Sequence, residues 1–225
     1  MASLDLDRLS AGERYRLVSG CITPRPIALV SSISPDGRTN LAPFSFFNAM
    51  GCDPIVFVFS PITMVNDGEE VLRDTLRNVR LPEDGGTGEM VIHLAVESNV
   101  RGVAACAEDL PYGESEIPLA GFTTQPSLKV APPRIVESPI AFECKTLQVI
   151  RTNPGHALSA NLVVAKAVHA WVDEGLTDDR LRVDQDALAT VGRVGGPEYV
   201  GTRVRFDLPR GQAALTHPLP FDASE

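Results

Sequence analysis

The sequence lacks the features that mark disulfide-rich, zinc-binding or membrane-spanning proteins. Its four cysteines are widely separated and form no CxxC pair, so they indicate neither a disulfide framework nor a zinc site. The N-terminal residues lack the basic start and apolar core of a signal peptide, and no apolar run approaches the length of a membrane span. We therefore expect free thiols in a reducing cytoplasm and no metal centre.

Basic residues are scarce relative to acidic ones. The 225 residues have a formal net charge of −9, which makes nucleic acids and anionic membrane surfaces poor partners. A hydrophobic content of 44% and a charged content of 22% are ordinary for a globular protein. No repeat, low-complexity tract or linker-like break divides the chain. We expect residues 1–225 to form one domain, with a core at about 20–200 and an extended C-terminal arm at about 203–225.

Several catalytic and nucleotide-binding motifs are also missing. The sequence contains no GxGxxG after a predicted strand, no Walker loop, no HExxH and no GxSxG. The absence of the GxGxxG fingerprint argues against a dedicated dinucleotide-binding domain. Any nicotinamide cofactor would therefore bind transiently, as a substrate.

Three β-rich runs dominate the stretch Ile27–Pro61. They are Ile27–Ser34, Asn40–Met50 and Ile55–Ser60, and turn signals rich in Pro, Asp and Gly separate them. We expect a meander at the centre of a β-barrel or sandwich. The third run is almost wholly apolar, which predicts burial on both faces.

The middle run has an unusual composition for a core strand. Pro43, Ser45 and Asn48 lie among three phenylalanines. A proline cannot donate to a strand ladder, so it marks an edge or a bulge, where backbone N–H groups are free. Small residues, free amides and aromatic rings together would suit a flat heteroaromatic ligand. An irregular core strand is the alternative, and composition alone favours it.

The segment Met64–Arg80 has apolar residues at helical spacing, and Asp67 with Glu70 predicts the start of a helix there. Arg73 is followed by short polar side chains. One interpretation is a surface helix with charge pairs such as Glu70–Arg73. The other is phosphate capture by guanidinium, hydroxyl and amide donors near a helix start.

The remaining elements follow from periodicity and capping signals. Ser10 and Glu13 form a capping-box pattern that predicts a helix over about Ser10–Ser19, with Leu17 and Val18 facing the core. We expect further strands at Glu89–Val96, Ile140–Thr152 and Leu158–Asp173, a helix from Ser98 or Asn99 to Ala107, a short helix at Asp184–Ala189 and a flexible loop at Gly192–Tyr199.

Three ionisable side chains have two interpretations each. His93, within a predicted central strand, is more often a hydrogen-bonded core histidine than a catalyst. His156 lies at a turn, where solvent exposure is favoured over a place in the wall of a nicotinamide site. Arg25 stands between two prolines, and it is either a solvated loop charge or a fixed cation beside a cofactor.

Taken together, RPIALVSS, DGRTNLAPFSFFNAMGCDPIVFVFSP and the following RDTLRN resemble the flavin reductase-like family, the FMN-binding split barrels. The resemblance covers about residues 20–200. It implies a mainly β fold with flanking helices (α+β), a Greek-key-like split β-barrel. The family commonly has a Lys-Asp-Thr-like motif where this chain has Arg73-Asp74-Thr75, a departure that keeps the charge and changes its geometry.

The resemblance implies reduction of a flavin by NADH or NADPH, with FMN, or FAD in its place, as the flavin. The flavin supplies the reactivity, so no catalytic residue is required, and His156 is a weak candidate only. The implied partners are a second copy of the chain and a separate flavin-dependent monooxygenase. The implied cofactor-binding residues are Ser31, Ser32, Ala42, Pro43, Phe44, Ser45, Phe46, Phe47, Asn48, Ser60 and Pro61 at the ring, and Arg73, Asp74, Thr75 and Asn78 at the phosphate.

Three functions remain open at this point. The chain is a reductase of diffusible flavin, or a flavoprotein that holds FMN tightly and reduces another acceptor, or a flavin-binding electron carrier without an enzymatic activity of its own. The sequence does not distinguish NADH from NADPH.

Overall fold

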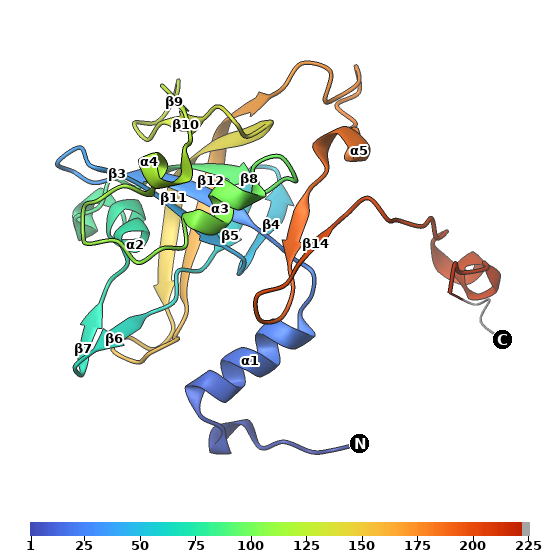
Figure 1. Ribbon diagram of the computed structural model, residues 1–225, viewed down its shortest axis with the longest axis horizontal. Coiled ribbons are helices and arrows are strands. Elements are labelled where there is room, and N and C mark those ends of the chain that lie inside the picture. Colours follow the sequence, from blue (N-terminus) through green and yellow to red (C-terminus); the bar gives the residue numbers. More distant parts are fainter. Residues whose placement is uncertain (222–225) are drawn as a thin grey trace.

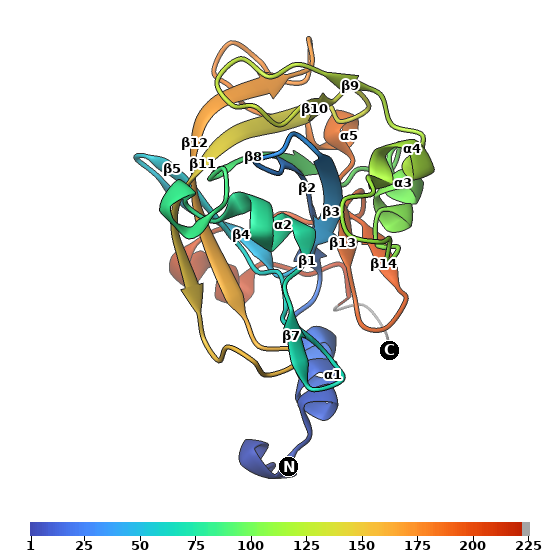
Figure 2. The ribbon, with the colours of Figure 1, turned by 90° about the vertical axis from the view of Figure 1, so that its left-hand side faces the viewer.

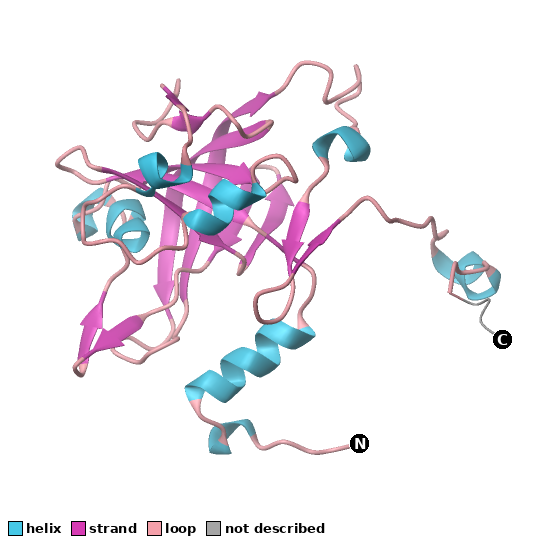
Figure 3. Cartoon of the chain, viewed as in Figure 1, coloured by secondary structure: helices cyan, strands magenta, loops and turns pink. Residues whose placement is uncertain are grey.

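A computed structural model describes residues 1–221 of the chain. Its main element is an antiparallel seven-stranded sheet with the strand order β3-β2-β8-β11-β12-β5-β4. The strands are β2 (Ala28–Ile33), β3 (Thr39–Phe44), β4 (Phe47–Cys52), β5 (Ile55–Phe59), β8 (Glu89–Leu94), β11 (Ile140–Arg151) and β12 (Asn161–Val172). The helices around this sheet are short (Figure 3). The fold is mainly β, as predicted, and it is a split barrel.

The predicted meander is wrong in its middle run, which forms two strands instead of one. β3 ends at Phe44 and pairs with β2, whereas β4 begins at Phe47 and pairs with β5 at the opposite edge of the sheet. Only Ser45 and Phe46 join these two edges. The Phe44 and Phe59 rings lie 5.2 Å apart, so the sheet curls until its edges approach each other. This gap between β3 and β4 is the split of the barrel.

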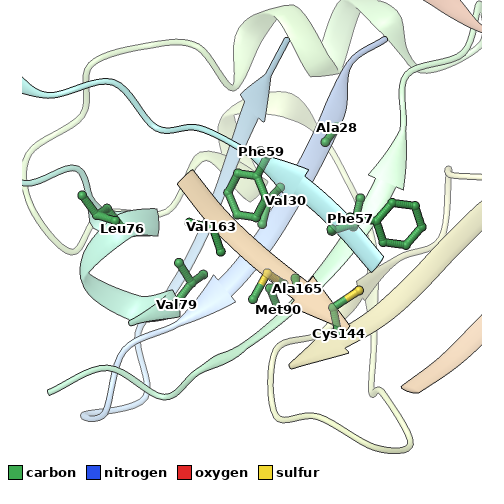
Figure 4. Close-up of a cluster of buried hydrophobic side chains, with 11 residues drawn as sticks. Ala28, Val30, Phe57, Phe59, Leu76, Val79, Met90, Cys144, Val163 and Ala165 are labelled. Carbon is green, nitrogen blue, oxygen red and sulfur yellow. The ribbon is translucent and has the colours of Figure 1, made fainter. Parts of the chain in front are cut away.

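The inward faces of the strands enclose one apolar core. Ala28 and Val30 of β2, Val163 and Ala165 of β12, and Phe57 and Phe59 of β5 belong to it (Figure 4). Helix α2 (Asp74–Val79) adds Leu76 and Val79 to the same cluster. Figure 2 shows α2 within the curve of the sheet, between β11 and β12 on one side and β2 and β3 on the other. The core therefore fixes α2 against the open end of the barrel.

The strands buried on both faces are β2 and β8, not the predicted Ile55–Ser60 run. Leu29 of β2 is fully buried in a second cluster under α3 (Val100–Ala105) and α4 (Glu116–Ala120), while Ala28 and Val30 face the barrel core. In β5 only alternate residues are buried, and Ile55 is 41% exposed. The reason is position, because β5 lies next to the edge strand β4, and its outward-facing Val56 and Val58 are only partly buried.

The predicted helix start at Asp67 is also wrong. Residues 64–71 form a hairpin, β6 (Met64–Asn66) with β7 (Glu69–Val71), and the helix begins only at Asp74. Asp67 and Gly68 form the turn, with φ angles of 52° and 83°. An Asp-Gly pair with two positive φ angles is the usual two-residue hairpin turn. The pair expected between Glu70 and Arg73 is absent, since Glu70 binds Arg151 and Arg73 binds Asp109.

The smaller elements surround the barrel. The loop expected at Gly192–Tyr199 is shorter, at residues 194–198, and connects the hairpin of β13 (Val191–Arg193) and β14 (Tyr199–Gly201). β13 also pairs with β1 (Arg25–Pro26). β9 (Thr124–Gln125) pairs with β10 (Arg134–Ile135). Helix α5 spans Gln185–Leu188, as expected, and 3₁₀ helices span Leu6–Arg8, Pro82–Asp84 and Gly211–Thr216.

The N-terminal segment with α1 and the segment after β14 extend away from the barrel (Figure 1). Helix α1 (Ala11–Cys21) has the predicted capping box between Ser10 and Glu13. The expectation that Val18 faces the core is wrong, because α1 stands beside the barrel and Val18 is 46% exposed. The segment after β14 leaves the barrel, and the last residues of the predicted arm, 222–225, lie outside the described residues. No helix within residues 1–221 has both the length and the apolar character required to cross a bilayer.

Candidate functional site

A cavity of about 360 Å³ lies at the split between β3 and β4. Its walls come from the end of β3, the Ser45–Phe46 link, the residues after β5, the start of α2 and the segment Cys106–Glu116. Several predicted cofactor-binding residues line it together: Ala42, Pro43, Phe44, Ser45, Phe46, Ser60, Arg73, Asp74 and Thr75. The volume lies in the usual range for a small-molecule site. The structure thus brings these nine residues, from both the predicted ring set and the predicted phosphate set, to one cavity.

The other predicted residues do not line this cavity, and each has a local role. Ser31, Ser32, Phe47, Asn48, Pro61 and Asn78 form this group. The Ser31 hydroxyl donates to Pro133 O at 2.6 Å, and Asn78 donates to the Ser32 hydroxyl at 3.1 Å, which ties α2 to β2. The Phe47 ring packs against Phe57, 5.9 Å between centroids.

Asn48 and Pro61 hold backbone near the strand ends. The Asn48 side chain accepts from Ala49 N at 2.8 Å, and Pro61 O accepts from Asn161 at 2.9 Å. His156 is exposed at its turn, with Nδ1 3.1 Å from Pro154 O, and it does not line the cavity.

Pro43 explains why the wall of the cavity is free of strand pairing. It lies opposite Leu29 in β3, an edge strand, where a missing N–H is tolerated. Beyond it the chain leaves the ladder, and within residues 1–221 the backbone N–H groups of Ser45 and Phe46 donate no hydrogen bond. The link therefore offers two unpaired backbone donors at the cavity.

Three hydroxyl groups add further donors. The oxygens of Ser45, Ser60 and Thr75 accept hydrogen bonds from Arg25 Nε (3.3 Å), Asn161 N (3.1 Å) and Asn40 Nδ2 (2.8 Å), respectively. A hydroxyl that accepts from the protein still has its own hydrogen to donate. Each of the three can therefore donate to a ligand in the cavity.

The cationic end of the cavity is formed by Arg73 and Arg77. Arg73 forms an ion pair with Asp109 of the opposite wall. The Arg77 Nε atom donates to Leu72 O at 2.9 Å, and its guanidinium lies 4.9 Å from the centroid of the Tyr112 ring. The contacts with Asp109 and Tyr112 hold the segment Cys106–Glu116 across the cavity. The arginines thus combine phosphate-compatible charge with a closed wall.

Two of the four carboxylates within residues 1–221 that line the cavity accept hydrogen bonds from backbone N–H groups. Asp74 accepts from Gly113 N at 3.1 Å, and Glu116 accepts from Leu41 N at 2.9 Å. Burial raises the pKa of Glu116, and the nearby Asp74 raises it further, while the bond from Leu41 opposes the shift. These hydrogen bonds reduce the repulsion that an anionic ligand would meet here.

Arg25 is not a solvated charge. Its side chain is 5% exposed, and it reaches Ser45 Oγ with Nε while Nη1 donates to Ser19 O and Ile22 O and Nη2 to Val194 O. Burial lowers the pKa of Arg25, but an arginine stays protonated in proteins. Of the two interpretations of Arg25, a fixed cation therefore matches its position next to the cavity wall.

The sequence did not indicate one wall of the cavity. The segment Cys106–Glu116 has no periodicity, and its contribution depends on contacts with residues far away in the chain. Tyr15 of α1 was missed for the same reason; its ring meets Phe46 edge-on at 6.2 Å. The sequence feature that could have indicated this wall is Tyr112, an isolated aromatic residue in a polar stretch.

The donor set suits a flavin mononucleotide. Reduced flavin develops negative charge near N1 and O2, which oriented amides and hydroxyls stabilise, and its phosphate requires cations or donors. The link Ser45–Phe46 supplies the first kind of group, and Arg73, Thr75 and Arg77 supply the second. Phe44 and Phe46 provide apolar surface beside them.

Comparison with known proteins points to one family. The flavin reductase like domain matches residues 19–192. A protein of Halalkalibacterium halodurans whose function is not assigned is 38% identical over 208 residues, which are 92% of this chain and 95% of that protein.

Two solved structures are similar over nearly their whole length. Component B of nitrilotriacetate monooxygenase from Bacillus cereus is 31% identical, with a TM-score of 0.82 over 92% of this chain and 98% of that chain. The 2-nitrobenzoate 2-nitroreductase of Pseudomonas fluorescens is also 31% identical, with a TM-score of 0.80 over 97% of this chain and 100% of that chain.

Proposed function

Because the chain belongs to the flavin reductase-like family, we propose that it is an NAD(P)H-dependent flavin reductase that supplies reduced flavin to a separate oxygenase. FMN is the proposed flavin, and FAD is the alternative. The observation that carries this proposal is the cavity at the barrel split, where unpaired backbone donors lie opposite an arginine-rich end. The similarity to a monooxygenase component B supports the role of a reductase that works with a second protein.

In this proposal the protein binds and orients, and the bound flavin supplies the hydride-transfer chemistry. Ser45 and Ser60 donate to the polar edge of the ring, and Phe44 and Phe46 contact its apolar surface. Arg73, Arg77 and Thr75 hold the phosphate. One face of the ring must stay open, because hydride transfer requires reacting atoms about 3–3.5 Å apart.

A second candidate is a flavoprotein that keeps its FMN and reduces another acceptor. The similarity to a 2-nitrobenzoate 2-nitroreductase favours it, since that enzyme is as similar in sequence as the monooxygenase component. The third alternative, an electron carrier that NAD(P)H does not reduce, uses the same cavity. The three differ in whether NAD(P)H reduces the flavin and whether the reduced flavin leaves.

The remaining parts of the proposal concern assembly and location. We propose a homodimer, because the apolar side chains of Leu147 and Ile150 on the long strand β11 are exposed. We also propose a cytoplasmic location, which suits an NAD(P)H-dependent enzyme whose four cysteines are all free.

The test begins with binding. FMN fluorescence should change on titration with the purified protein, and NADH or NADPH oxidation should then saturate with added flavin at concentrations on the order of micromolar. Reduced flavin should also reach an unrelated acceptor across a dialysis membrane.

The other outcomes select among the alternatives. Reduction of bound FMN without release of reduced flavin would replace the first function with the second. Flavin binding without any reduction by NADH or NADPH would leave the electron carrier. If FMN fluorescence does not change on titration and no flavin co-purifies with the protein, the cofactor assignment is refuted.

A further inference from the structure

A second cavity of about 490 Å³ adjoins the proposed flavin cavity. It lies between α1, β1 and the β13–β14 hairpin. The residues Tyr15, Pro43, Ser45 and Ala107 line both cavities. A ligand in the second cavity would therefore lie beside the wall that we assign to the flavin ring.

Within residues 1–221, three arginines and no acidic residue line the second cavity. The arginines are Arg16, Arg25 and Arg193. In the part of the chain that the structure describes, no carboxylate lies within 4.0 Å of any of their guanidinium groups. The charge of Arg16 does contribute to lowering the pKa of Glu13, but that carboxylate is bound mainly by Ser10 in the helix cap. In a chain of net charge −9, three neighbouring cations without a counterion are unusual.

The three arginines differ in how many of their side-chain donors already have a partner. Arg25 is buried and uses all its nitrogens on the Ser45 hydroxyl and backbone carbonyls, so it is a fixed charge. Arg193 lies over the Tyr199 ring, 4.5 Å from its centroid, and donates to Gly196 O at 2.7 Å. Arg16 makes no hydrogen bond with its side chain within residues 1–221. Arg16 and Arg193 thus retain donors for a ligand.

These contacts also link the two cavities through Ser45. Its oxygen accepts from Arg25, so its hydroxyl hydrogen is left to point elsewhere, and Ser45 lines both spaces. The fixed positive charge beside this serine also favours a negative group nearby. A molecule that reaches the flavin ring with one end could therefore place an anionic end among the arginines.

We propose that this second cavity binds the oxyanion of the second substrate of the flavin site, with Arg16 and Arg193 as direct contacts and Arg25 as a fixed supporting charge. The inference rests on the proposed flavin function of the first cavity. Two kinds of substrate share this chemistry. The oxyanion is a phosphate of the nicotinamide dinucleotide that donates hydride, or the carboxylate of an aromatic acceptor.

Direct binding of simple anions tests the cavity without any turnover. Inorganic pyrophosphate and benzoate are titrated calorimetrically into FMN-loaded protein, for the wild type and for the double variant Arg16→Met/Arg193→Met. Charge-assisted bonds of this kind change affinity by about tenfold or more. We expect at least one of the two anions to bind the double variant about tenfold more weakly, while its FMN affinity stays unchanged.

Arg14→Met/Arg8→Met is the matched control. It removes the same charge near α1, but neither residue lines the second cavity, so anion binding should not change. Arg16→Lys/Arg193→Lys keeps the charge and should restore most of the affinity, which separates a binding role from loss of the hairpin fold.

The two anions identify the source of the oxyanion. Weaker pyrophosphate binding with an increased KM for NADPH or NADH points to the dinucleotide, and weaker benzoate binding alone points to a carboxylated acceptor. If neither anion binds the wild type, or both bind the double variant unchanged, the inference is wrong. If anions bind as expected but NAD(P)H reduces no flavin, the proposed reductase fails and the anion site stands.

Discussion

His93 shows how the fold fixes the protonation of one side chain. It is fully buried in β8, with Nδ1 3.0 Å from Leu29 O, and Ile135 N donates to its Nε2 at 2.9 Å. Since Nε2 accepts, the proton of the neutral ring is on Nδ1 and donates to Leu29. Burial lowers the pKa of His93 to about 4, with a further contribution from the charge of Arg134 and opposition from the Leu29 bond. This matches the expectation of a hydrogen-bonded core histidine.

The first prediction is a loss of stability in acid that depends on His93. The ordinary pKa of 6.5 applies to the unfolded chain, so as the pH falls from 6.5 towards 4 the unfolded state binds this proton first. The free energy of unfolding should therefore fall by up to roughly 3 kcal/mol through this group. His93→Gln should be less stable at pH 7, yet lose less stability between pH 7 and pH 4.5, in denaturant titrations.

The comparison for this prediction is His156→Gln, which removes an imidazole exposed at a turn. It should keep the pH dependence of the wild type. Equal slopes for the His93 variant and the wild type would mean that other groups cause the acid sensitivity.

At the scale of elements, the segment Cys106–Glu116 closes the proposed flavin cavity through a few contacts. Arg73 pairs with Asp109, Asp74 accepts from Gly113 N, and Tyr112 lies against Arg77 and also Arg38. Arg73 therefore has two roles to separate, one as a phosphate ligand and one as a tie for this segment.

The second prediction separates these roles. Arg73→Ala should weaken FMN binding by about 1–3 kcal/mol, the range for a lost charge-assisted bond, and should change riboflavin binding little, because riboflavin has no phosphate. Asp109→Asn breaks the same ion pair and keeps the cation, so it should preserve FMN affinity. Fluorescence titration of both flavins measures this. Equal losses for FMN and riboflavin in both variants would indicate that Arg73 acts only by holding the segment.

Local patterns in the sequence predicted the elements whose cause is local. The capping box of α1, the strands β8, β11 and β12 and the short helix α5 depend on spacing that the sequence displays. The hairpin β6–β7 was missed although its signal was local, because Asp67 was interpreted as a helix cap instead of as half of an Asp-Gly turn.

The topology could not be predicted in the same way. Nothing near Ser45 and Phe46 indicates that the strands before and after them lie at opposite edges of one sheet. That arrangement depends on β2 pairing with β8 and on β5 pairing with β12, and β8 and β12 are distant in sequence. The same holds for the site. Pro43 and Arg73 are unusual in the sequence itself, and the family resemblance favoured their ligand-binding interpretation, whereas Tyr15 and Tyr112 meet the cavity only through the tertiary fold.

At the scale of the whole molecule, helices cover one part of the sheet, and another part exposes apolar side chains to solvent. Helices α3 and α4 cover the outer side of β2, but the long strands β11 and β12 have exposed apolar side chains: Leu147, Ile150 and Val168. Apolar residues gathered on one face commonly mark an interaction surface. This face is the one that we propose for the homodimer.

The third prediction tests this assembly. The wild type, with a chain mass of 24.2 kDa, should sediment as a dimer at micromolar concentrations, and Leu147→Lys/Ile150→Lys should shift it to the monomer, because two buried like charges would meet the apolar partner surface. Leu181→Lys changes an apolar residue that is 80% exposed on a different loop and should remain dimeric. A monomeric wild type, or a double variant that stays dimeric, would exclude this face as the interface. If the flavin lies near the subunit boundary, the monomeric variant should also bind FMN more weakly than the Leu181 control, although none of its changed residues lines the cavity.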